Sequence, residues 1–353
     1  MKKKVLLGMS GGVDSSVSAI LLKEQGYDVI GVTMKLWKSE DESTCCSETA
    51  ENDAKKVCEY LEIPHYTIDL KKEFSKYVID DFIESYASYK TPNPCIECNK
   101  YLKFGEIYKK AIELKADYIS TGHYAKVEYN EQYNRYVLKK SKSVKKDQSY
   151  VLYGISREIL SKILFPLGDF KDKEQIREIA TKKGLFVANK PDSEDICFIP
   201  NGDYKKFLEV NFIKKPENGK IVNMKGEVLG KHNGLYNYTI GQRKGIGVTS
   251  AKPLYVVRFD SNRNELVVGK KEDLHSSEIY VDNFKLLLVD ELLEPVKVKT
   301  KIRYSSKEAE GTLYKVDKDT VRIEFNEYVV GATPGQSAVC YIDDIVFGGG
   351  KIR

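Results

Sequence analysis

A short stretch near the start of the chain combines the residue types that hold a phosphate. Positions 8–16 read Gly-Met-Ser-Gly-Gly-Val-Asp-Ser-Ser, between an apolar run at 5–7 and a helix-periodic apolar run at 17–22. This order predicts a strand, a tight loop and a helix. Adjacent glycines let the backbone approach a ligand closely, and the unpaired amides at a helix start attract an anion. We call residues 8–16 the phosphate loop and expect a di- or polyphosphate there.

Polar side chains of the phosphate loop add to this expectation. Ser10, Ser15 and Ser16 supply hydroxyl donors, and the carboxylate of Asp14 could hold a magnesium ion beside the phosphate. No Gly-Lys-Ser/Thr follows, so the loop is not a Walker A motif, and it is not Gly-x-Gly-x-x-Gly either. It resembles the Ser-Gly-Gly-x-Asp-Ser loop of the ATP pyrophosphatases, which bind the pyrophosphate of ATP and transfer AMP to a substrate. The alternative is an ordinary glycine-containing turn capped by serine.

Three cysteines form a second candidate set. Cys95 and Cys98 stand in a Cys-x-x-Cys that follows Thr-Pro-Asn-Pro and precedes a helix expected over 101–114. The prolines keep the backbone extended and end the preceding helix. Thiols at a helix start have a lowered pKa and are reactive or metal-binding. Cys197 follows a charged loop and could be a third member of the site; the alternative for all three is a buried structural thiol.

The elements around these residues predict how they are positioned. Strands are expected at 27–32, 65–70 and 117–121, and helices at 48–61, 74–89 and 173–183. Alternating strands and helices indicate a doubly wound parallel α/β sheet, whose strands end at a common ligand crevice. Met34, Gly122 and His123 follow strand ends and are therefore expected near that crevice. A hairpin is expected over 129–140 and a further helix over 159–163.

The texture changes after residue 200. Short β runs separated by glycine occur at 219–223, 227–230, 254–259 and 265–269, and denser ones at 297–304, 310–315, 320–325 and 337–342. Even spacing of short strands indicates a small barrel. We therefore predict three domains: a catalytic α/β domain at 1–200, a small mostly β domain at 201–272 and a C-terminal β-barrel at 273–353.

Composition sets the outer limits. With 353 residues, 41% hydrophobic and 31% charged, the chain has an ordinary globular balance and is long enough for several domains. The net charge of +5 is mild, so nucleic-acid binding would need the positive charge gathered on one face. Five lysines within residues 139–146 could hold phosphates or form a solvated loop. No apolar stretch is long enough for a membrane span or signal core, which favours a cytoplasmic protein. Its seven cysteines are then expected to be reactive or metal-binding rather than paired in structural disulfides.

Taken in order, the motifs resemble those of the bacterial tRNA-specific 2-thiouridylase family. They are the phosphate loop, Thr-Pro-Asn-Pro-x-x-x-Cys-Asn, Thr-Gly-His-Tyr, Lys-Asp-Gln-Ser-Tyr, Asp-Ser-x-Asp-Ile-Cys-Phe and Gly-Gln-Arg-Lys-Gly. The resemblance runs from about residue 3 to 353. It implies ATP- and Mg²⁺-dependent adenylation of C2 of the wobble uridine of tRNA, then sulfur transfer that gives 2-thiouridine, AMP and pyrophosphate. It further implies a partner that donates sulfur, such as a cysteine desulfurase or sulfur-relay protein, and a monomer when no tRNA is bound.

The resemblance also assigns roles to residues. Cys98 matches the catalytic nucleophile, and Cys197 matches the cysteine that carries the persulfide. The ATP-binding positions are Gly8, Met9, Ser10, Gly11, Gly12, Val13, Asp14, Ser15, Met34 and Gly122. The positions that meet the target base are Asn93, Pro94 and Cys95, and those that contact tRNA elsewhere are His123, Lys146, Asp147, Gln148, Arg303, Tyr304 and Gln336.

One position departs from the family pattern. Many members carry aspartate where this chain has Cys95, so no carboxylate base is available there. Cys95, Cys98 and Cys197 could instead hold a [4Fe–4S] cluster with one open iron. Persulfide chemistry and cluster chemistry both remain open at this stage. The competing functions are another ATP pyrophosphatase acting on a small-molecule amide or nucleobase, and a non-catalytic iron–sulfur or RNA-binding module.

Overall fold

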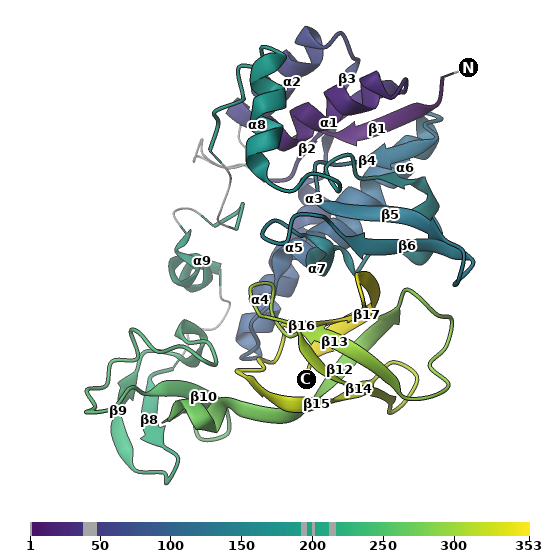
Figure 1. Ribbon diagram of the computed structural model, residues 1–353. Coiled ribbons are helices and arrows are strands. Elements are labelled where there is room, and N and C mark those ends of the chain that lie inside the picture. The colour runs from purple at the N-terminus through teal and green to yellow at the C-terminus, as the bar shows by residue number, and fades with distance from the viewer. Residues whose placement is uncertain (1, 38–47, 192–195, 200–201, 212–216) are drawn as a thin grey trace. The chain divides into compact units, whose positions relative to one another are not determined.

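The computed structural model describes residues 2–37, 48–191, 196–199, 202–211 and 217–353 (Figure 1). The chain divides into two compact units, which are described separately. The first unit comprises Met1–Ile79, Pro94–Gly202 and Asp344–Val346. The second unit comprises Asp80–Asn93, Asp203–Asp343 and Phe347–Arg353.

A five-stranded parallel sheet organises the first unit. Its strands are β1 (Lys4–Gly8), β2 (Asp28–Lys35), β3 (His65–Asp69), β4 (Tyr118–Ser120) and β7 (Ile163–Leu164). They lie in the order β3-β2-β1-β4-β7, and every pair is parallel. The chain winds from β1 outward to β3 and then returns to β4 on the other side of β1. The carboxyl ends of β1 and β4 therefore flank the switch point, where ligands bind in open α/β sheets.

Helices cover this sheet. The main ones are α1 (Val13–Glu24), α2 (Glu48–Tyr60), α6 (Ile107–Glu113) and α8 (Lys173–Lys182). Helix α1 packs against α8, as Figure 1 shows. Apolar side chains from β1, α1, α2 and α8 share one buried core that includes Val5, Leu7, Val17, Val57 and Ile176. Helix α1 leads from β1 to β2, whereas α6 leads to β4, which lies on the other side of β1. Right-handed crossovers in these opposite directions place the two helices on opposite faces of the sheet. The predicted doubly wound α/β class is confirmed.

The helices near the cysteine pair differ from the prediction. A helical segment runs through α3 (Lys71–Phe74), the π-helix η1 (Ser75–Ile79) and α4 (Asp80–Ala87). A second one begins with α5 (Pro94–Glu97) and continues through the π-helix η2 (Cys98–Glu106) into α6. The expectation that a helix starts at 101 was therefore wrong. Proline is well suited to the first position of a helix, because its fixed φ is helical and no amide is needed there.

Shorter elements complete the first unit. Strands β5 (Ala125–Asn130) and β6 (Arg135–Lys140) form an antiparallel hairpin, which confirms the hairpin predicted over 129–140. Helix α7 (Ser149–Leu152) follows the loop after β6. The expected helix at 159–163 is a 3₁₀-helix, η3 (Arg157–Lys162).

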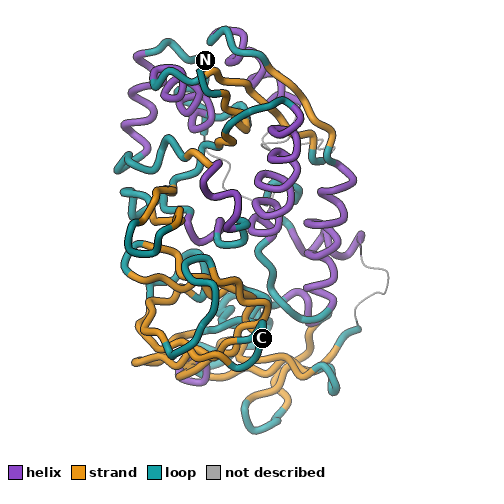
Figure 2. Tube along the Cα trace, turned by 90° about the vertical axis from the view of Figure 1, so that its right-hand side faces the viewer, coloured by secondary structure: helices purple, strands orange, loops and turns teal. Residues whose placement is uncertain are grey.

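The second unit is mostly β beyond its helices α4 and α9 (Tyr204–Asn211). Strands β8 (Gly219–Asn223), β9 (Val228–His232), β10 (Tyr255–Asp260) and β11 (Glu265–Gly269) form a sheet in the order β10-β11-β8-β9. A separate sheet follows with β12 (His275–Leu286), β13 (Val296–Lys301), β14 (Ala309–Lys315), β15 (Val321–Val330), β16 (Ser337–Ile342) and β17 (Ile345–Ile352). Because β12 pairs with both β15 and β17, this sheet closes into a barrel near the C-terminus (Figure 2). The predicted barrel is confirmed.

None of the helices in the described part of the chain is long and apolar enough to cross a membrane.

Candidate functional site

The phosphate loop has the predicted geometry. Strand β1 ends at Gly8 and α1 begins at Val13, so residues 9–12 make the turn between them. Gly11 has a φ of +68°, and a side chain there would collide with the carbonyl oxygen of Ala50. The hydroxyls of Ser15 and Ser16 donate to the Gly12 carbonyl, at 3.2 and 2.8 Å. These two hydroxyls therefore fasten the loop to the first turn of α1, a role that the sequence did not indicate.

The end of β4 lies against the phosphate loop. A Cβ added to Gly122 would come within 2.9 Å of the Asp14 carbonyl carbon and the Ser15 amide nitrogen. The two backbones are in contact only because Gly122 has no side chain. The structure thus brings Gly122 together with the phosphate loop, as the sequence predicted. Met34 is half-buried near the carboxyl end of β2, at the same edge of the sheet.

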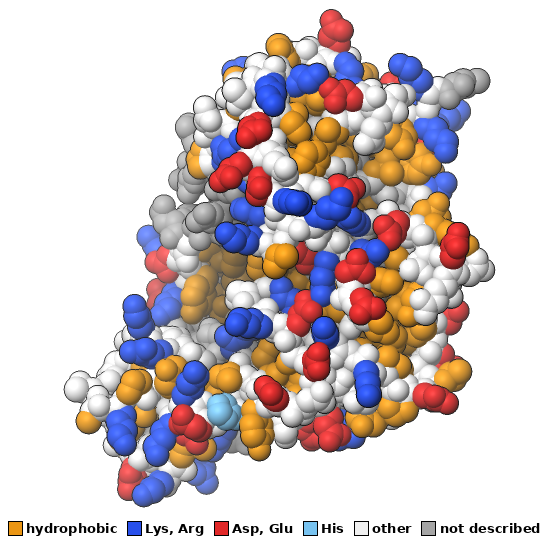
Figure 3. Space-filling view, in the orientation of Figure 1, with side chains coloured by type: hydrophobic (Ala, Val, Ile, Leu, Met, Phe, Trp, Pro, Cys, Tyr) orange, Lys and Arg blue, Asp and Glu red, His pale blue; other side chains and the backbone are white. Residues whose placement is uncertain are grey.

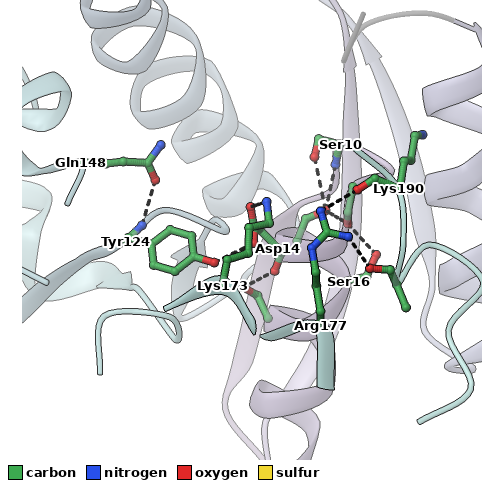
Figure 4. A network of polar contacts seen from close by, with 12 residues as sticks. Ser10, Asp14, Ser16, Tyr124, Gln148, Lys173, Arg177 and Lys190 are labelled. Atoms are coloured by element: carbon green, nitrogen blue, oxygen red, sulfur yellow. Dashed lines mark hydrogen bonds and ion pairs between the residues drawn. The ribbon is translucent and has the colours of Figure 1, made fainter. Parts of the chain in front are cut away.

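The Asp14 carboxylate is the centre of a polar network (Figure 4). Its two oxygens accept a hydrogen bond from the Tyr124 hydroxyl at 2.8 Å and one from Lys173 Nζ at 2.9 Å. The amide of Tyr124 in turn donates to Gln148 Oε1 at 2.9 Å. A carboxylate oxygen is a ligand that Mg²⁺ prefers, so Asp14 fits the expected metal-binding role. Tyr124 and Lys173 were not singled out from the sequence.

A second lysine reaches the loop from the segment after α8. Lys190 Nζ donates to the Gly11 carbonyl at 3.1 Å and pairs with Asp53 at 2.7 Å. The guanidinium of Arg177, on α8, donates to the carbonyls of Ala188 and Lys190, at 2.7 and 3.0 Å, and so fixes this segment (Figure 4). Neither residue was singled out from the sequence. Lys190 lies 179 residues from Gly11, and a contact over that separation leaves no local pattern.

The cysteine pair lies in the first turns of the helical segment that begins at Pro94. Cys95 is exposed, whereas Cys98, one turn later, is buried. The neighbouring Asn99 is also buried, and its side-chain amide donates to the Val151 carbonyl at 2.9 Å. This hydrogen bond anchors the turn that carries Cys98. The two thiols of the Cys-x-x-Cys motif therefore differ in their access to solvent.

Cys197 is half-buried in a short turn. The next residue, Phe198, is buried and packs edge-to-face on Phe74, with ring centroids 5.6 Å apart. Helix α3, which carries Phe74, packs against η2, which begins at Cys98. The turn that holds Cys197 is thus anchored beside the helix that holds Cys98. Positions 192–195 of the motif around Cys197 lie outside the described residues.

The arrangement of the three cysteines does not form a site for an iron–sulfur cluster. Within the residues that the structure describes, which include Cys95, Cys98 and Cys197, no group of three His, Cys, Asp or Glu side chains is placed to hold a metal ion. Three converging thiolates are the minimum for the expected open-iron cluster. The residues as arranged do not fit this cofactor.

His123, an expected tRNA contact, is buried. Its Nδ1 lies 2.7 Å from the Thr121 hydroxyl, and its ring packs against both Phe104 and Phe165, which also contact each other. Burial first, and then the charge of Lys103, lower the pKa of His123 well below its usual value. The imidazole is therefore neutral at physiological pH and offers a phosphate no charge.

The expected contacts Lys146–Gln148 lie next to this network. The Asp147 carboxylate accepts from the Ser141 amide at 2.9 Å and from the Ser149 hydroxyl at 2.7 Å. Gln148 bonds to the backbone of Tyr124 at both its amide and its side chain. Both residues thus shape the loop, while Lys146 is half-buried beside them.

The surrounding lysine run is partly neutralised. Lys139 pairs with Glu128 at 2.6 Å, and Lys142 pairs with Asp169 at 2.7 Å. On the face seen in Figure 3, basic and acidic side chains are interspersed rather than gathered by sign. The sequence offered phosphate holding and a solvated loop as alternatives. The exposed, paired Lys142 favours the second, whereas Lys139 lies on strand β6 and is held by Glu128 and Asp344 with its side chain only 17% exposed.

Three expected tRNA contacts belong to the second unit. The Arg303 guanidinium donates to the Ile240 carbonyl at 3.0 Å and also to Gly331 and Thr333, so it ties the barrel to the loop before β10. Tyr304 is exposed. The Gln336 side chain donates to the Thr91 carbonyl at 2.9 Å, two residues before Asn93. Gln336 and the Asn93 segment are therefore brought together within this unit.

Family models match most of the chain in three consecutive parts. Residues 3–201 match the tRNA methyl transferase HUP domain, and residues 205–270 match the tRNA methyl transferase PRC-barrel domain. Residues 276–352 match the aminomethyltransferase β-barrel domain.

Curated relatives align over the whole chain. The tRNA-specific 2-thiouridylase MnmA of Clostridioides difficile is 49% identical and that of Acetivibrio thermocellus 48%, each over 100% of this chain and 99% of the relative. Among solved structures, the U34-tRNA thiolase NcsA from Methanococcus maripaludis with its [4Fe-4S] cluster is 20% identical, with a TM-score of 0.34 over 60% of this chain and 67% of that one. That likeness is too low to support an inference about the site. The full-length identity to the curated relatives is decisive, and the chain belongs to the tRNA-specific 2-thiouridylase family.

Proposed function

We propose that this protein is an ATP-dependent tRNA-uridine 2-sulfurtransferase. The reaction adenylates the C2 oxygen of the wobble uridine of tRNA and then replaces it with sulfur, giving 2-thiouridine, AMP and pyrophosphate. One observation carries the proposal: a chain that aligns end to end with 2-thiouridylases holds an intact phosphate loop at the switch point of its sheet. The main alternative, a small-molecule ATP pyrophosphatase, accounts for the loop but not for the anchored thiols or the β tail.

The first step needs a bound triphosphate. The proposed ATP site comprises Gly8–Ser15, Met34 and Gly122, whose backbone or side chains lie at the carboxyl edge of the sheet. Loop amides and the start of α1 hold the phosphates. Mg²⁺, which the Asp14 carboxylate would hold, supplies charge neutralisation for the departing pyrophosphate. The C2 oxygen of uridine attacks the α-phosphorus, and pyrophosphate leaves.

The second step moves sulfur. We assign the persulfide to Cys197: a donor protein loads its thiol, and the terminal sulfur attacks C2 of the adenylated uridine with departure of AMP. The thiolate of Cys98 then attacks the Cys197 sulfur, which forms a Cys98–Cys197 disulfide and leaves the transferred sulfur on C2. An external thiol reductant restores the pair. The anchoring of the Cys197 turn beside the Cys98 helix supports this pairing.

Persulfide chemistry is proposed over a [4Fe–4S] cluster, because the three thiols do not make a metal-binding group. Cys95 is exposed and sits one turn before Cys98, so it is assigned to the surface that meets the target base, together with Asn93 and Pro94. Anaerobic purification followed by iron and sulfide analysis tests this choice. Stoichiometric iron whose loss in Cys95→Ser abolishes activity would contradict it.

The remaining assignments follow from the family. We propose tRNA contacts at His123, Lys146–Gln148, Arg303, Tyr304 and Gln336, three domains at 1–200, 201–272 and 273–353, a cytoplasmic location and a monomeric free state. His123 is neutral, so its contact would be with a base or sugar rather than with a phosphate. A cysteine desulfurase or sulfur-relay protein is the proposed donor.

The deciding experiment measures pyrophosphate release and 2-thiouridine formation on unmodified tRNA. Wild-type protein should release pyrophosphate only when tRNA is present. Cys98→Ser and Cys197→Ser should still release pyrophosphate but form no 2-thiouridine, whereas Asp14→Asn should do neither. Pyrophosphate release that depends on a small molecule and not on tRNA would favour the alternative enzyme, and no release under any condition would exclude both.

A further inference from the structure

The phosphate loop contains no cation of its own. Residues 8–16 include neither Lys nor Arg, and Asp14 adds a negative charge where a polyphosphate is expected. In a Walker A loop, a lysine within the motif reaches the β- and γ-phosphates. Apart from the Mg²⁺ that Asp14 would hold, only amides, hydroxyls and a helix dipole of this loop face the several negative charges of a polyphosphate, so cations from other parts of the chain would strengthen binding.

Lys173 is one such cation, and its place in the helix is unusual. It is the first residue of α8, where the helix dipole disfavours positive charge. The preceding residue, Asp172, caps the helix in the favourable sense by accepting from the Gln175 amide. The Lys173 side chain is only 14% exposed, and its ammonium points to Asp14 (Figure 4). Natural proteins depart from such local preferences mainly at functional or strained positions.

Lys190 is the second. Its ammonium lies against the loop backbone at Gly11 and is balanced by Asp53. Arg177 holds the carbonyls of Ala188 and Lys190 and so fixes the backbone from which this lysine extends. Arg177 therefore positions Lys190 at the phosphate loop.

We propose that Lys173 and Lys190 bind the phosphates of ATP and supply, from α8 and the segment after it, the charge that the loop lacks. The proposal rests on the proposed function, because it requires ATP as the guest of the loop. When a triphosphate binds, the ammonium of Lys173 passes from the Asp14 carboxylate to a phosphate oxygen. This exchange leaves the Asp14 oxygen to the metal ion.

The competing explanation is that both lysines form ordinary ion pairs. The chain offers a comparison at the other end of the same helix: Lys183, the C-cap residue of α8, pairs with Glu24 at 2.7 Å, and both side chains are 51% exposed. That pair is a solvated surface contact, whereas the Lys173–Asp14 pair is shielded, with side chains 14% and 29% exposed. Lys183→Gln is therefore the matched control.

The test is calorimetric titration of a non-hydrolysable ATP analogue, and of adenosine, with full-length protein and Mg²⁺ but no tRNA. Each of Lys173→Gln and Lys190→Gln should bind the analogue about 10- to 100-fold more weakly, the range for losing a charged hydrogen bond. Adenosine affinity should stay unchanged in both, and Lys183→Gln should match wild type throughout. Lys173→Arg, which keeps the charge, should restore most of the affinity.

The outcomes separate this proposal from the proposed function. Wild type that fails to bind the analogue contradicts the function itself. Wild type that binds, together with Lys→Gln variants of unchanged affinity, overturns only the role of the lysines. An equal loss for adenosine and the analogue also overturns it, because a damaged fold affects both ligands. Thermal melting accompanies each titration, and if Lys173→Gln does not fold, Lys190→Gln decides alone.

Discussion

Replacing Gly122 with alanine is expected to disturb the candidate ATP site through a single methyl group. The new Cβ would lie 2.9 Å from the carbonyl carbon of Asp14 and 2.9 Å from the amide nitrogen of Ser15. Both are backbone atoms in the first turn of α1, so no side-chain rotation relieves the contact. Either the end of β4 or the start of α1 must shift.

The magnitude follows from this contact. Overpacking of a well-packed site costs about 1–3 kcal/mol. For a unit of this size, about 2–4 °C of melting temperature corresponds to each kcal/mol, so a loss of roughly 2–12 °C is expected. A shift at the start of α1 also moves the amides that face the phosphates. Loss of one hydrogen bond to a charged group, about 1.5–3 kcal/mol, weakens ATP binding roughly 10- to 100-fold.

The assay combines thermal unfolding with calorimetric titration of an ATP analogue. Gly8→Ala is the control within the phosphate loop, because a Cβ at Gly8 would have its nearest neighbour, Thr121 Cγ2, at an ordinary 3.5 Å. Gly8→Ala should therefore melt close to wild type. If Gly122→Ala melted like Gly8→Ala and bound the analogue like wild type, the contact between β4 and the loop would not exist as described.

Three further changes test other parts of the site. Tyr124→Phe removes the hydroxyl that donates to Asp14 and should weaken binding of the Mg²⁺–ATP analogue by up to about tenfold, measured by calorimetry; unchanged affinity would mean that this hydrogen bond does not position the carboxylate. His123→Phe tests the lowered pKa of His123. As the pH falls below about 6.5, this imidazole binds a proton in the unfolded state but not in the folded state, so wild type loses stability. The melting temperature of the variant should therefore fall less than that of wild type between pH 7.5 and 5.5. Two other histidines with lowered pKa remain in that variant, so the slope should shrink rather than vanish. Arg303→Met leaves the carbonyl and hydroxyl acceptors of this guanidinium unpaired and should lower both the melting temperature and the affinity for tRNA. The slope of log affinity against log salt concentration should stay unchanged. A slope smaller in magnitude by about one would instead identify Arg303 as a phosphate contact.

Much of the fold could be predicted because apolar periodicity determines it. Strands expected at 219–223, 265–269 and 337–342 occur at those bounds as β8, β11 and β16. The helix expected over 173–183 is α8, which ends one residue earlier. Helix α8 buries one face, whereas β11 and β16 are short apolar runs buried along almost their whole length, so the side-chain pattern records the surroundings in each case.

Other elements were hidden by residues whose local preference opposes the fold. Strand β17 contains Gly348, Gly349 and Gly350, which are poor strand formers. A side chain at Gly348 would collide with the Lys285 carbonyl of β12, and one at Gly350 would press on the Asp282 carbonyl. Glycine is thus needed for the close pairing that closes the barrel, a requirement that becomes visible only when both strands are in place.

In the candidate site, too, some residues could be placed from the sequence and others could not. The phosphate loop and Gly122 could be placed from sequence because strand ends converge at the switch point. Asp147 and Gln148 were expected to face tRNA, yet the structure gives them hydrogen bonds inside the chain. A sequence motif identifies residues that matter and does not say whether they contact a ligand or hold the residue that does.

The segment after β4 illustrates what such holding achieves. Gly122 touches the phosphate loop, and Tyr124 donates to the Asp14 carboxylate through its hydroxyl while its amide donates to Gln148. Tyr124 is buried, so its ring transmits a displacement at one end to the other. A shift of the loop at 146–148 on binding tRNA would therefore move Asp14. Because binding free energies are linked, ATP and tRNA would then change each other's affinity by the same factor. Tyr124→Phe should reduce that factor toward one, since the phenyl ring keeps the packing but loses the hydroxyl that donates to the Asp14 carboxylate.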